Sequence, residues 1–161
     1  MEMEKDMLIC RATDTDLEGI NKLLCQVLEV HHKGRPDIFK SDCKKYTDKE
    51  LLEIIADDQR PIFVAKENGQ ILGYAFCILQ QQTDSNILTD IKTLYIDDLC
   101  VDEDVRGKHI GTSLYEYVCD FAKQMGCYNI TLNVWAFNEN AMKFYEKCGM
   151  RERNIYMEKI L

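Results

Sequence analysis

Apolar residues recur along the chain at two spacings, and each spacing predicts one kind of element. Steps of three and four residues place side chains on one face of a helix. Such steps run from 17 to about 31, from 47 to about 57, from 110 to 125 and from 138 to 148. Gly126 and Gly149 follow the last two segments, and glycine is typical of a helix end. Four helices are therefore expected.

Runs rich in β-branched and aromatic residues lie between these segments and predict strands. They cover 7–12, 61–66, 70–81, 94–101, 129–135 and 155–159. Asn68-Gly69 supplies the left-handed residues of a tight hairpin between the second and third strands. The polar stretch 80–90 predicts a loop. A polar joint from His31 to Phe39 should end the first helix, because Pro36 keeps Arg35 out of helical geometry.

In the strand at 94–101 the apolar positions change phase. Leu94 and Ile96 alternate in one phase, and Leu99 and Val101 alternate in the other. One extra residue, a bulge, would produce this shift and leave backbone groups unpaired. A strand buried on both faces would show the same pattern, so the phase shift leaves both interpretations open.

The composition predicts a soluble globular protein with one domain, 1–161. Hydrophobic residues make up 46% and charged residues 30% of the 161 residues. No run approaches the roughly 20 apolar residues that cross a bilayer, and the acidic start lacks the features of a signal peptide, so we expect a cytoplasmic protein without a membrane partner. A net charge of −8 argues against nucleic acid and suits a cationic small molecule or a basic peptide.

The eight cysteines predict neither a disulfide scaffold nor a metal site. None belongs to a C-x-x-C pair, and most lie in apolar periodic segments, where a reduced cysteine acts as a small hydrophobe. His31 and His32 are adjacent and cannot both face one metal from a helix. Reduced thiols and no bound metal are therefore expected.

A glycine-containing loop joins the strand at 94–101 to the helix at 110–125. It reads Arg106-Gly107-Lys108-His109-Ile110-Gly111-Thr112. Such a loop turns its amides inward at a helix N-terminus, where the helix dipole favours a phosphate. Lys108 precedes Gly111, so the ATP-type phosphate loop is excluded, and the three glycines of a dinucleotide fingerprint are absent. A plain strand-to-helix connection is the alternative.

Two motifs in this half of the chain resemble those of the GCN5-related N-acetyltransferases, and the segment Ile96-Asp97-Asp98-Leu99 is similar to their polyamine branch. The first is Val101 with Arg106-Gly107-Lys108-x-Ile110-Gly111, and the second is Asn138-x-x-Ala141-x-x-Phe144-Tyr145-Glu146-Lys147-x-Gly149. The resemblance is specific from about Leu94 to Met150. It implies a mixed α/β fold with a central twisted sheet of about six or seven strands and about four helices. It also leaves a homodimer open, since dimers are common in that family.

The resemblance implies that acetyl-CoA is the acetyl donor and assigns residues to it. The CoA phosphates would lie on Arg106, Gly107, Lys108, His109, Ile110, Gly111 and Thr112, the pantetheine arm beside Leu99, Cys100 and Val101, and Asn138 would also contact CoA. His109 stands where the family usually has glycine. If that position needs a positive φ, histidine costs about 1–3 kcal/mol, and otherwise it costs little.

The chemistry needs a group that takes the proton of the amine and a group that protonates the departing thiolate. An alkylammonium is almost wholly protonated at neutral pH, so the site must hold a cation and remove its proton. The resemblance makes Asp97 the candidate base and Tyr145 the candidate acid, and Asp98 a candidate for ammonium binding or for structure. Adjacent strand residues face opposite ways, so the two acids are not expected to act together. His31, Arg35 and Phe39 are candidate substrate contacts, or else part of a solvated connection.

The sequence therefore predicts an N-acetyltransferase that acts on a primary amine, by direct transfer in a ternary complex. A small cationic amine, such as a polyamine or an aminoglycoside-like compound, is the expected acceptor. A protein N-terminus or lysine is the main rival acceptor. A non-enzymatic acyl-CoA-binding module and a phosphate-binding fold unrelated to CoA are the alternatives from other classes.

Overall fold

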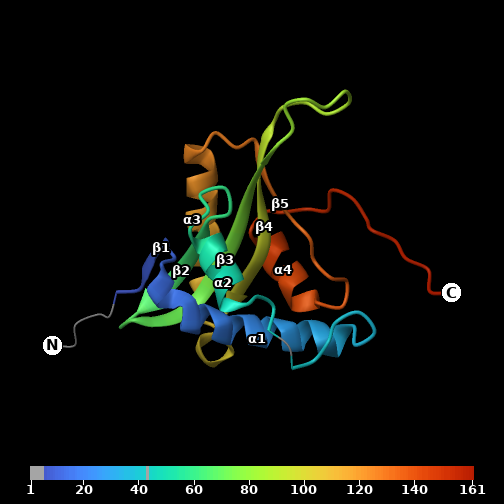
Figure 1. Cartoon of the computed structure of the whole chain (residues 1–161). Coiled ribbons are helices and arrows are strands. Elements are labelled where there is room, and N and C mark those ends of the chain that lie inside the picture. The colour runs from blue at the N-terminus through green and yellow to red at the C-terminus, as the bar shows by residue number, and fades with distance from the viewer. Residues whose placement is uncertain (1–5, 43) are drawn as a thin grey trace.

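A five-stranded mixed sheet forms the centre of the protein (Figure 1). The structure is a computed structural model, and it describes residues 6–42 and 44–161. The strands are β1 (Leu8–Arg11), β2 (Ile62–Glu67), β3 (Gln70–Gln81), β4 (Lys92–Val101) and β5 (Asn129–Leu132), in that spatial order. The first four are antiparallel neighbours, and β5 runs parallel to β4. The expected mixed α/β fold is confirmed, with one or two fewer strands than predicted.

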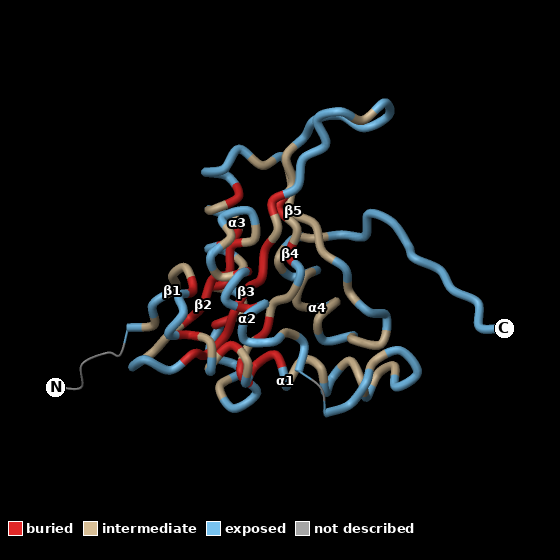
Figure 2. Tube along the Cα trace, in the orientation of Figure 1, coloured by how far each residue is buried: buried red, intermediate tan, exposed pale blue. Residues whose placement is uncertain are grey.

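Helices cover both faces of the sheet. They are α1 (Leu17–Gly34), α2 (Asp48–Ile55), α3 (Ile110–Gln124) and α4 (Glu139–Lys147), with short 3-10 turns η1 (Asp14–Asp16) and η2 (Glu103–Val105). Buried residues of α1 and α2 pack with one side of β2, β3 and β4, where Tyr74 and Phe76 lie. Buried residues of α3 pack with the other side, where Leu94 and Ile96 lie. Figure 2 shows the buried positions concentrated along the central strands.

The hairpin between β2 and β3 turns on the predicted residues. Asn68 has φ 51° and Gly69 has φ 76°, both in the left-handed region that a two-residue turn requires. The first helix is one turn longer than expected. It ends at Gly34, because Pro36 constrains only Arg35, whose φ and ψ are −141° and 75°.

Of the two interpretations of the phase shift in the central strand, the bulge is the one that the structure shows. Phe76 of β3 pairs with Asp98, and the next residue, Cys77, pairs with Ile96, so Asp97 is the extra residue on β4. The shift reverses the facing of the strand. Leu94 and Ile96 pack on the α3 side of the sheet, whereas Cys100, after the bulge, packs on the α1 side.

Two strand predictions were wrong at the carboxyl end of the chain. β5 stops at Leu132 instead of 135, because its pairing with β4 ends at Ile96, directly before the bulge. The strand expected at 155–159 does not form, because this segment has no neighbouring strand in the described chain. Residues 151–161 are all exposed and extend away from the domain (Figures 1 and 2).

The side chains depart from the sequence prediction at two further places. The apolar spacing of 47–57 places Leu51, Leu52, Ile54 and Ile55 on the buried side of α2, but Leu52 is 40% exposed, because the short helix is buried through Leu51 and Ile54. The seven described cysteines are free, as predicted, but only Cys77 and Cys100 are buried. Burial raises the pKa of both thiols to about 12. Cys43 lies outside the described residues. Across the described chain, no helix combines the length and the apolar character needed to span a membrane.

Candidate active site

The loop that enters α3 has the backbone form of an anion site. Gly107 has φ 87° and His109, the N-cap of α3, has φ 59°. The two left-handed residues turn the backbone of the loop into the start of α3, and the first-turn amides of α3 have no partner inside the helix. His109 has a positive φ, so the cost of about 1–3 kcal/mol for a histidine in a left-handed conformation applies here.

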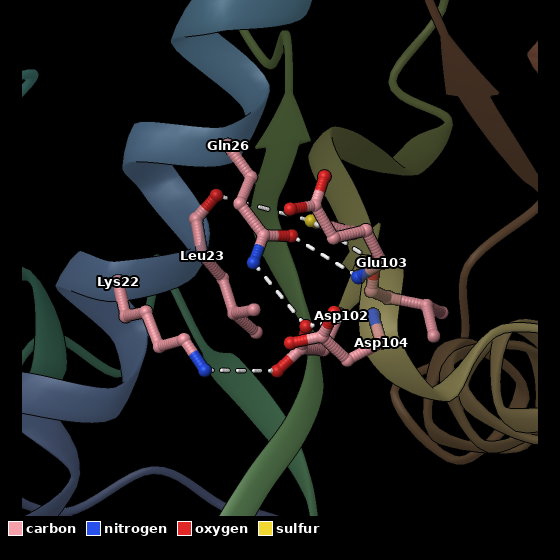
Figure 3. A network of polar contacts seen from close by, with 8 residues as sticks. Lys22, Leu23, Gln26, Asp102, Glu103 and Asp104 are labelled. Carbon is pink, nitrogen blue, oxygen red and sulfur yellow. Dashed lines mark hydrogen bonds and ion pairs between the residues drawn. The ribbon is translucent and has the colours of Figure 1, made fainter.

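A buried aspartate ties this loop to α1 (Figure 3). Asp102 is 1% exposed and accepts hydrogen bonds from Lys22 Nζ at 3.3 Å and Gln26 Nε2 at 3.2 Å. It also accepts from the amide of Asp104 at 3.1 Å, and Gln26 Oε1 accepts from the amide of Glu103 at 3.2 Å. The turn that leads to the loop is thereby fixed from both sides.

Beside the loop, α3 and α4 enclose a space next to β4. A Cβ on Gly111 would lie 3.4 Å from the ring of Phe144 and 3.5 Å from Val101, so the helices approach β4 closely at the start of α3. A cavity of about 380 Å³ follows, lined by Thr112, Tyr115, Glu116, Phe144, Lys147 and Cys148. The cavity thus opens next to the amides at the start of α3.

β4 and β5 separate at the bulge. Their pairing covers only Thr93–Ile96 and Asn129–Leu132, so among the described strands residues 98–101 have a partner on the β3 side alone. Leu99, Cys100 and Val101, the predicted neighbours of the pantetheine arm, lie on this unpaired edge. An extended ligand arm can therefore hydrogen-bond there as an added strand would.

The bulge brings both aspartates near one cation. Lys45 Nζ lies 3.7 Å from Asp97 Oδ2, and the charges of Asp98 and Asp97 both act to raise the pKa of Lys45 against the effect of its burial. The expectation that the two acids face opposite ways does not hold at the bulge, because the extra residue turns the strand between them, whereas their separate roles stay a prediction.

Asp98 is the more enclosed of the two acids. Tyr74 Oη donates a hydrogen bond of 2.6 Å to Asp98 Oδ2. Burial raises the pKa of Asp98 above 3.8, and the Tyr74 bond and the Lys45 charge only partly offset this effect. A carboxylate with a raised pKa is a better proton acceptor near neutral pH.

Tyr145 of α4 lies where the charge of Asp98 reaches it. Burial, and next the charge of Asp98, raise the pKa of this phenol well above 10. It is therefore fully protonated at neutral pH and able to donate a proton. Asn138 caps α4 through a hydrogen bond from the amide of Ala141 to Oδ1 at 3.2 Å, which fixes the helix that carries Tyr145.

Asp97 lines a smaller cavity on the α2 side of the sheet. Its volume is about 100 Å³, and its wall includes Tyr46, Arg60, Phe76 and Asp97. The cavity lies beside the acid pair and is large enough for only a small group, such as an aminoalkyl end.

His31, Phe39 and Trp135 form an aromatic cluster. The rings of His31 and Phe39 are 4.9 Å apart, and those of Phe39 and Trp135 are 5.2 Å apart. Burial and, next, the charge of Lys45 lower the pKa of His31. Arg35 points elsewhere, because its guanidinium pairs with Asp37 and with Glu158 near the end of the chain.

Sequence reasoning missed Lys45, Tyr74 and Trp135. Lys45 lies in the loop between α1 and α2, Tyr74 is one of several aromatic residues of a buried strand, and Trp135 was assigned to a strand. No sequence motif identifies Lys45 or Tyr74 as a site residue. The hydrogen bond from Tyr74 to Asp98 depends on the register of β3 and β4, which a sequence pattern does not fix.

Known proteins resemble the chain both in sequence and in fold. The profile of the acetyltransferase (GNAT) family matches residues 26–150. Glucosamine 6-phosphate N-acetyltransferase from Arabidopsis thaliana is 32% identical over 99 residues, which cover 53% of this chain and 64% of that protein. The chain thus spans less than two thirds of this curated relative in the sequence match.

Two crystal structures resemble the whole fold. A point mutant of the BH1408 protein from Bacillus halodurans has a TM-score of 0.91 and 34% identity, covering 96% of this chain and 99% of that one. The Arabidopsis thaliana glucosamine-6-phosphate N-acetyltransferase structure has a TM-score of 0.71 and 28% identity, covering 96% and 98%. With the family profile matched over most of its length, the chain belongs to the acetyltransferase (GNAT) family.

Proposed function

We propose that the protein is an acetyl-CoA-dependent N-acetyltransferase that acts on a primary amine by direct transfer in a ternary complex. One observation carries the proposal. Asp98, held by a 2.6 Å hydrogen bond from Tyr74, lies on a stretch of β4 that lacks a partner on the β5 side, and its charge contributes to the raised pKa of Tyr145. A base and an acid are thus available at one place, next to an edge suited to an extended thioester arm.

The residues present fit acetyl-CoA, which supplies the acetyl group as a thioester. The amides from Gly107 to Thr112 would hold the diphosphate, with the helix dipole adding about 0.3–1 kcal/mol. Leu99, Cys100 and Val101 would pair with the pantetheine arm. Lys147, on the wall of the cavity between α3 and α4, adds a cation close to the diphosphate. Asn138 serves the site through the helix that it caps.

For the amine proton we favour Asp98 over Asp97. Asp98 has the raised pKa and the hydrogen bond that fixes its carboxylate, whereas Asp97 is exposed and paired with Lys45. Asp97 then holds the incoming ammonium at the mouth of the small cavity. The sequence instead made Asp97 the candidate base and Asp98 a candidate for ammonium binding, so the proposal exchanges the two roles.

The two protons balance across the reaction. As the amine nitrogen bonds to the acetyl carbon and the carbon–sulfur bond breaks, Asp98 accepts the amine proton, directly or through water. Tyr145 gives its proton to the departing thiolate and is restored from solvent. The products are an N-acetyl amide and the free thiol of CoA.

We propose a small amine as the acceptor. The acid pair, the small cavity and the net charge of −8 all favour a cation. Amino sugar phosphates belong in the same test, because the Arabidopsis relative is named for one. His31 and Phe39 would line the acceptor side, whereas contact of Arg35 with substrate, and the likeness to the polyamine branch, stay predictions.

Three further predictions about the whole protein accompany the proposed function. We propose that 1–161 acts as one acetyltransferase domain, that it works in the cytoplasm, and that it forms a homodimer. A protein N-terminus or lysine remains the rival acceptor.

Release of CoA thiol across an amine panel tests the proposal. The panel should hold polyamines, aminoglycosides, amino sugars and their phosphates, and peptides with a free N-terminus or lysine. The proposal expects thiol release that depends on a small amine, and stabilisation against heat by acetyl-CoA but not by ATP or NAD. Stabilisation without release from any amine would instead support a binding module, and peptide-only release would support the rival acceptor.

A further inference from the structure

A lysine of the protein occupies the position that the proposed function gives to the acceptor amine. Lys45 Nζ lies 3.7 Å from Asp97 Oδ2, and the charge of Asp98 also acts on it. These two carboxylates are the ones proposed to hold the ammonium of the acceptor and to take its proton. Lys45 is itself a primary alkylamine, which is the chemical class proposed for the acceptor.

The chain that follows Lys45 is fixed by two contacts. Thr47 caps α2 by accepting a hydrogen bond of 3.2 Å from the amide of Glu50. The ring of Tyr46 lies 6.2 Å from that of Phe76, at an interplanar angle of 20°, and Phe76 is a residue of β3 opposite the bulge. Lys45 thus leaves the backbone at a fixed place beside the bulge, and its side chain is only 31% exposed.

Lys45 meets the acid pair as a cation. Burial acts to lower its pKa, but the charges of Asp98, Tyr46 and Asp97 outweigh this effect, so the pKa is raised. An ammonium group is not a nucleophile, and it must lose a proton before it can attack a thioester. The contact is therefore the one that an acceptor amine makes before its proton is removed.

The donor side of the proposed site reaches the same place. The edge of β4 that lacks a partner toward β5 begins at Asp98, and the charge of Asp98 contributes to the raised pKa of Tyr145. A thioester arm on this edge would thus end beside the acid pair that Lys45 contacts. A group held in place next to its reaction partner also reacts far faster than the same group free in solution.

Resting on the proposed function, we propose that the protein acetylates its own Lys45 on Nζ. The nitrogen bonds to the acetyl carbon as the carbon–sulfur bond of acetyl-CoA breaks. The ammonium loses two protons in turn to Asp98, which returns them to solvent. Tyr145 gives one proton to the departing thiolate and regains it from solvent. The products are acetylated Lys45, the free thiol of CoA and one released proton.

Acetylation removes the positive charge of Lys45. The neutral amide forms no ion pair with Asp97, so the acid pair becomes free to take up the ammonium of another amine. Until then, Lys45 and an external amine compete for the two acids. The unmodified protein should therefore bind an amine more weakly than Lys45→Met does.

Mass analysis of the full chain after incubation with isotopically labelled acetyl-CoA, without an acceptor, tests the proposal. One labelled acetyl group should appear on Lys45, with one equivalent of CoA thiol. Lys45→Arg, which keeps the cation but lacks the amine, should not be labelled at this position. The matched control Lys44→Arg alters the neighbouring lysine, which is 50% exposed and pairs with Asp48, and should be labelled at Lys45 as in the wild type.

Two rate measurements separate acetylation within the site from chemical acetylation of a surface lysine. Tyr145→Phe should acetylate Lys45 about tenfold more slowly or less, as expected when a proton donor is lost. At saturating acetyl-CoA, the first-order rate constant should not change with protein concentration. An acetyl group already on Lys45 in the purified wild type, and reduced in purified Tyr145→Phe, would support the proposal as well.

The results that overturn the proposal also separate it from the proposed function. Thiol release with an amine of the panel, while Lys45 stays unmodified, would leave the function standing and make the contact with Asp97 an ion pair only. Neither thiol release nor labelling would overturn both. Label spread evenly over the lysines, or a rate proportional to protein concentration, would exclude acetylation of Lys45 by its own chain.

Discussion

Tyr74 Oη donates a 2.6 Å hydrogen bond to Asp98 Oδ2, joining β3 to the bulge of β4 at the candidate active site. The bond favours the ionised form of Asp98 and opposes the burial that raises its pKa. It also fixes the direction of the carboxylate. The bulge therefore positions the carboxylate of Asp98 as a proton acceptor, and it also ends the pairing of β4 with β5.

Removing that bond should shift the pH dependence of catalysis. In Tyr74→Phe the pKa of Asp98 rises further, so the base is protonated over a wider acidic range. The acidic limb of the kcat profile should move to higher pH, while kcat well above the limb is nearly kept. Steady-state rates from pH 5 to 9 check this, with the exposed Tyr128→Phe as control. If the acidic limb of the kcat profile does not move, Asp98 is not the base whose protonation limits the rate.

Tyr145→Phe should lower kcat about tenfold or more, the usual scale for loss of a proton donor. The affinity for acetyl-CoA should change little, because the removed hydroxyl acts on the departing sulfur. Single-turnover rates and calorimetric titration measure the two effects separately. Unchanged turnover would remove Tyr145 from the mechanism.

Lys45→Met should improve binding of a cationic amine and move the acidic limb upward. The lysine cation competes for the acid pair and also lowers the pKa of Asp98. KM for the amine should fall by about fivefold above the limb, on the scale of ~1 kcal/mol for a partly exposed ion pair. Lys44→Met, which removes the neighbouring cation that pairs with Asp48, is the matched control. A higher KM in Lys45→Met would show that this lysine assists acceptor binding.

His109→Gly should raise the free energy of unfolding by about 1 kcal/mol. The left-handed conformation at φ 59° costs a residue with a Cβ roughly 1–2 kcal/mol, from which the greater flexibility of unfolded glycine is subtracted. Affinity for acetyl-CoA should be kept, since the backbone amides do the binding. Urea unfolding measures the change, with Lys108→Gly as a control expected to lose stability. A destabilised His109→Gly would mean that the imidazole itself supports the loop.

Asp102→Asn should reduce stability by about 1–3 kcal/mol at neutral pH, the scale for hydrogen bonds to a buried charge. Burial opposes ionisation of Asp102, but bonds from the Asp104 amide, Gln26 and Lys22 outweigh it and hold the pKa below 3.8. The ionised form therefore stabilises the fold above pH 3.8, and this contribution is lost as the pH falls through the lower folded pKa.

Unfolding of both proteins between pH 2 and 7 tests this dependence. The difference between wild type and Asp102→Asn should be constant above pH 5 and shrink toward pH 2. Asp104→Asn, at an exposed carboxylate, should show little difference at any pH. A constant difference down to pH 2 would exclude the charge as its cause.

Features with a local cause were predictable from the sequence. The hairpin at Asn68-Gly69 and the loop before Ile110 each depend on residues close together in the chain, whereas the phase shift near Asp97 indicated a bulge only as one of two interpretations. Lys45 and Tyr74 meet the acid pair only through tertiary packing, so no spacing reveals them. The segment 155–159 has strand composition, but a strand also needs a partner, and sequence composition does not say where the partner lies.

The central claim is that the amides from Gly107 to Thr112 hold a diphosphate whose thioester reaches Tyr145. A crystal structure with acetyl-CoA and no acceptor measures this most directly. The account predicts phosphate oxygens within hydrogen-bond distance of these amides and the sulfur within reach of Tyr145 Oη. A donor bound elsewhere, or a sulfur distant from Tyr145, would contradict it.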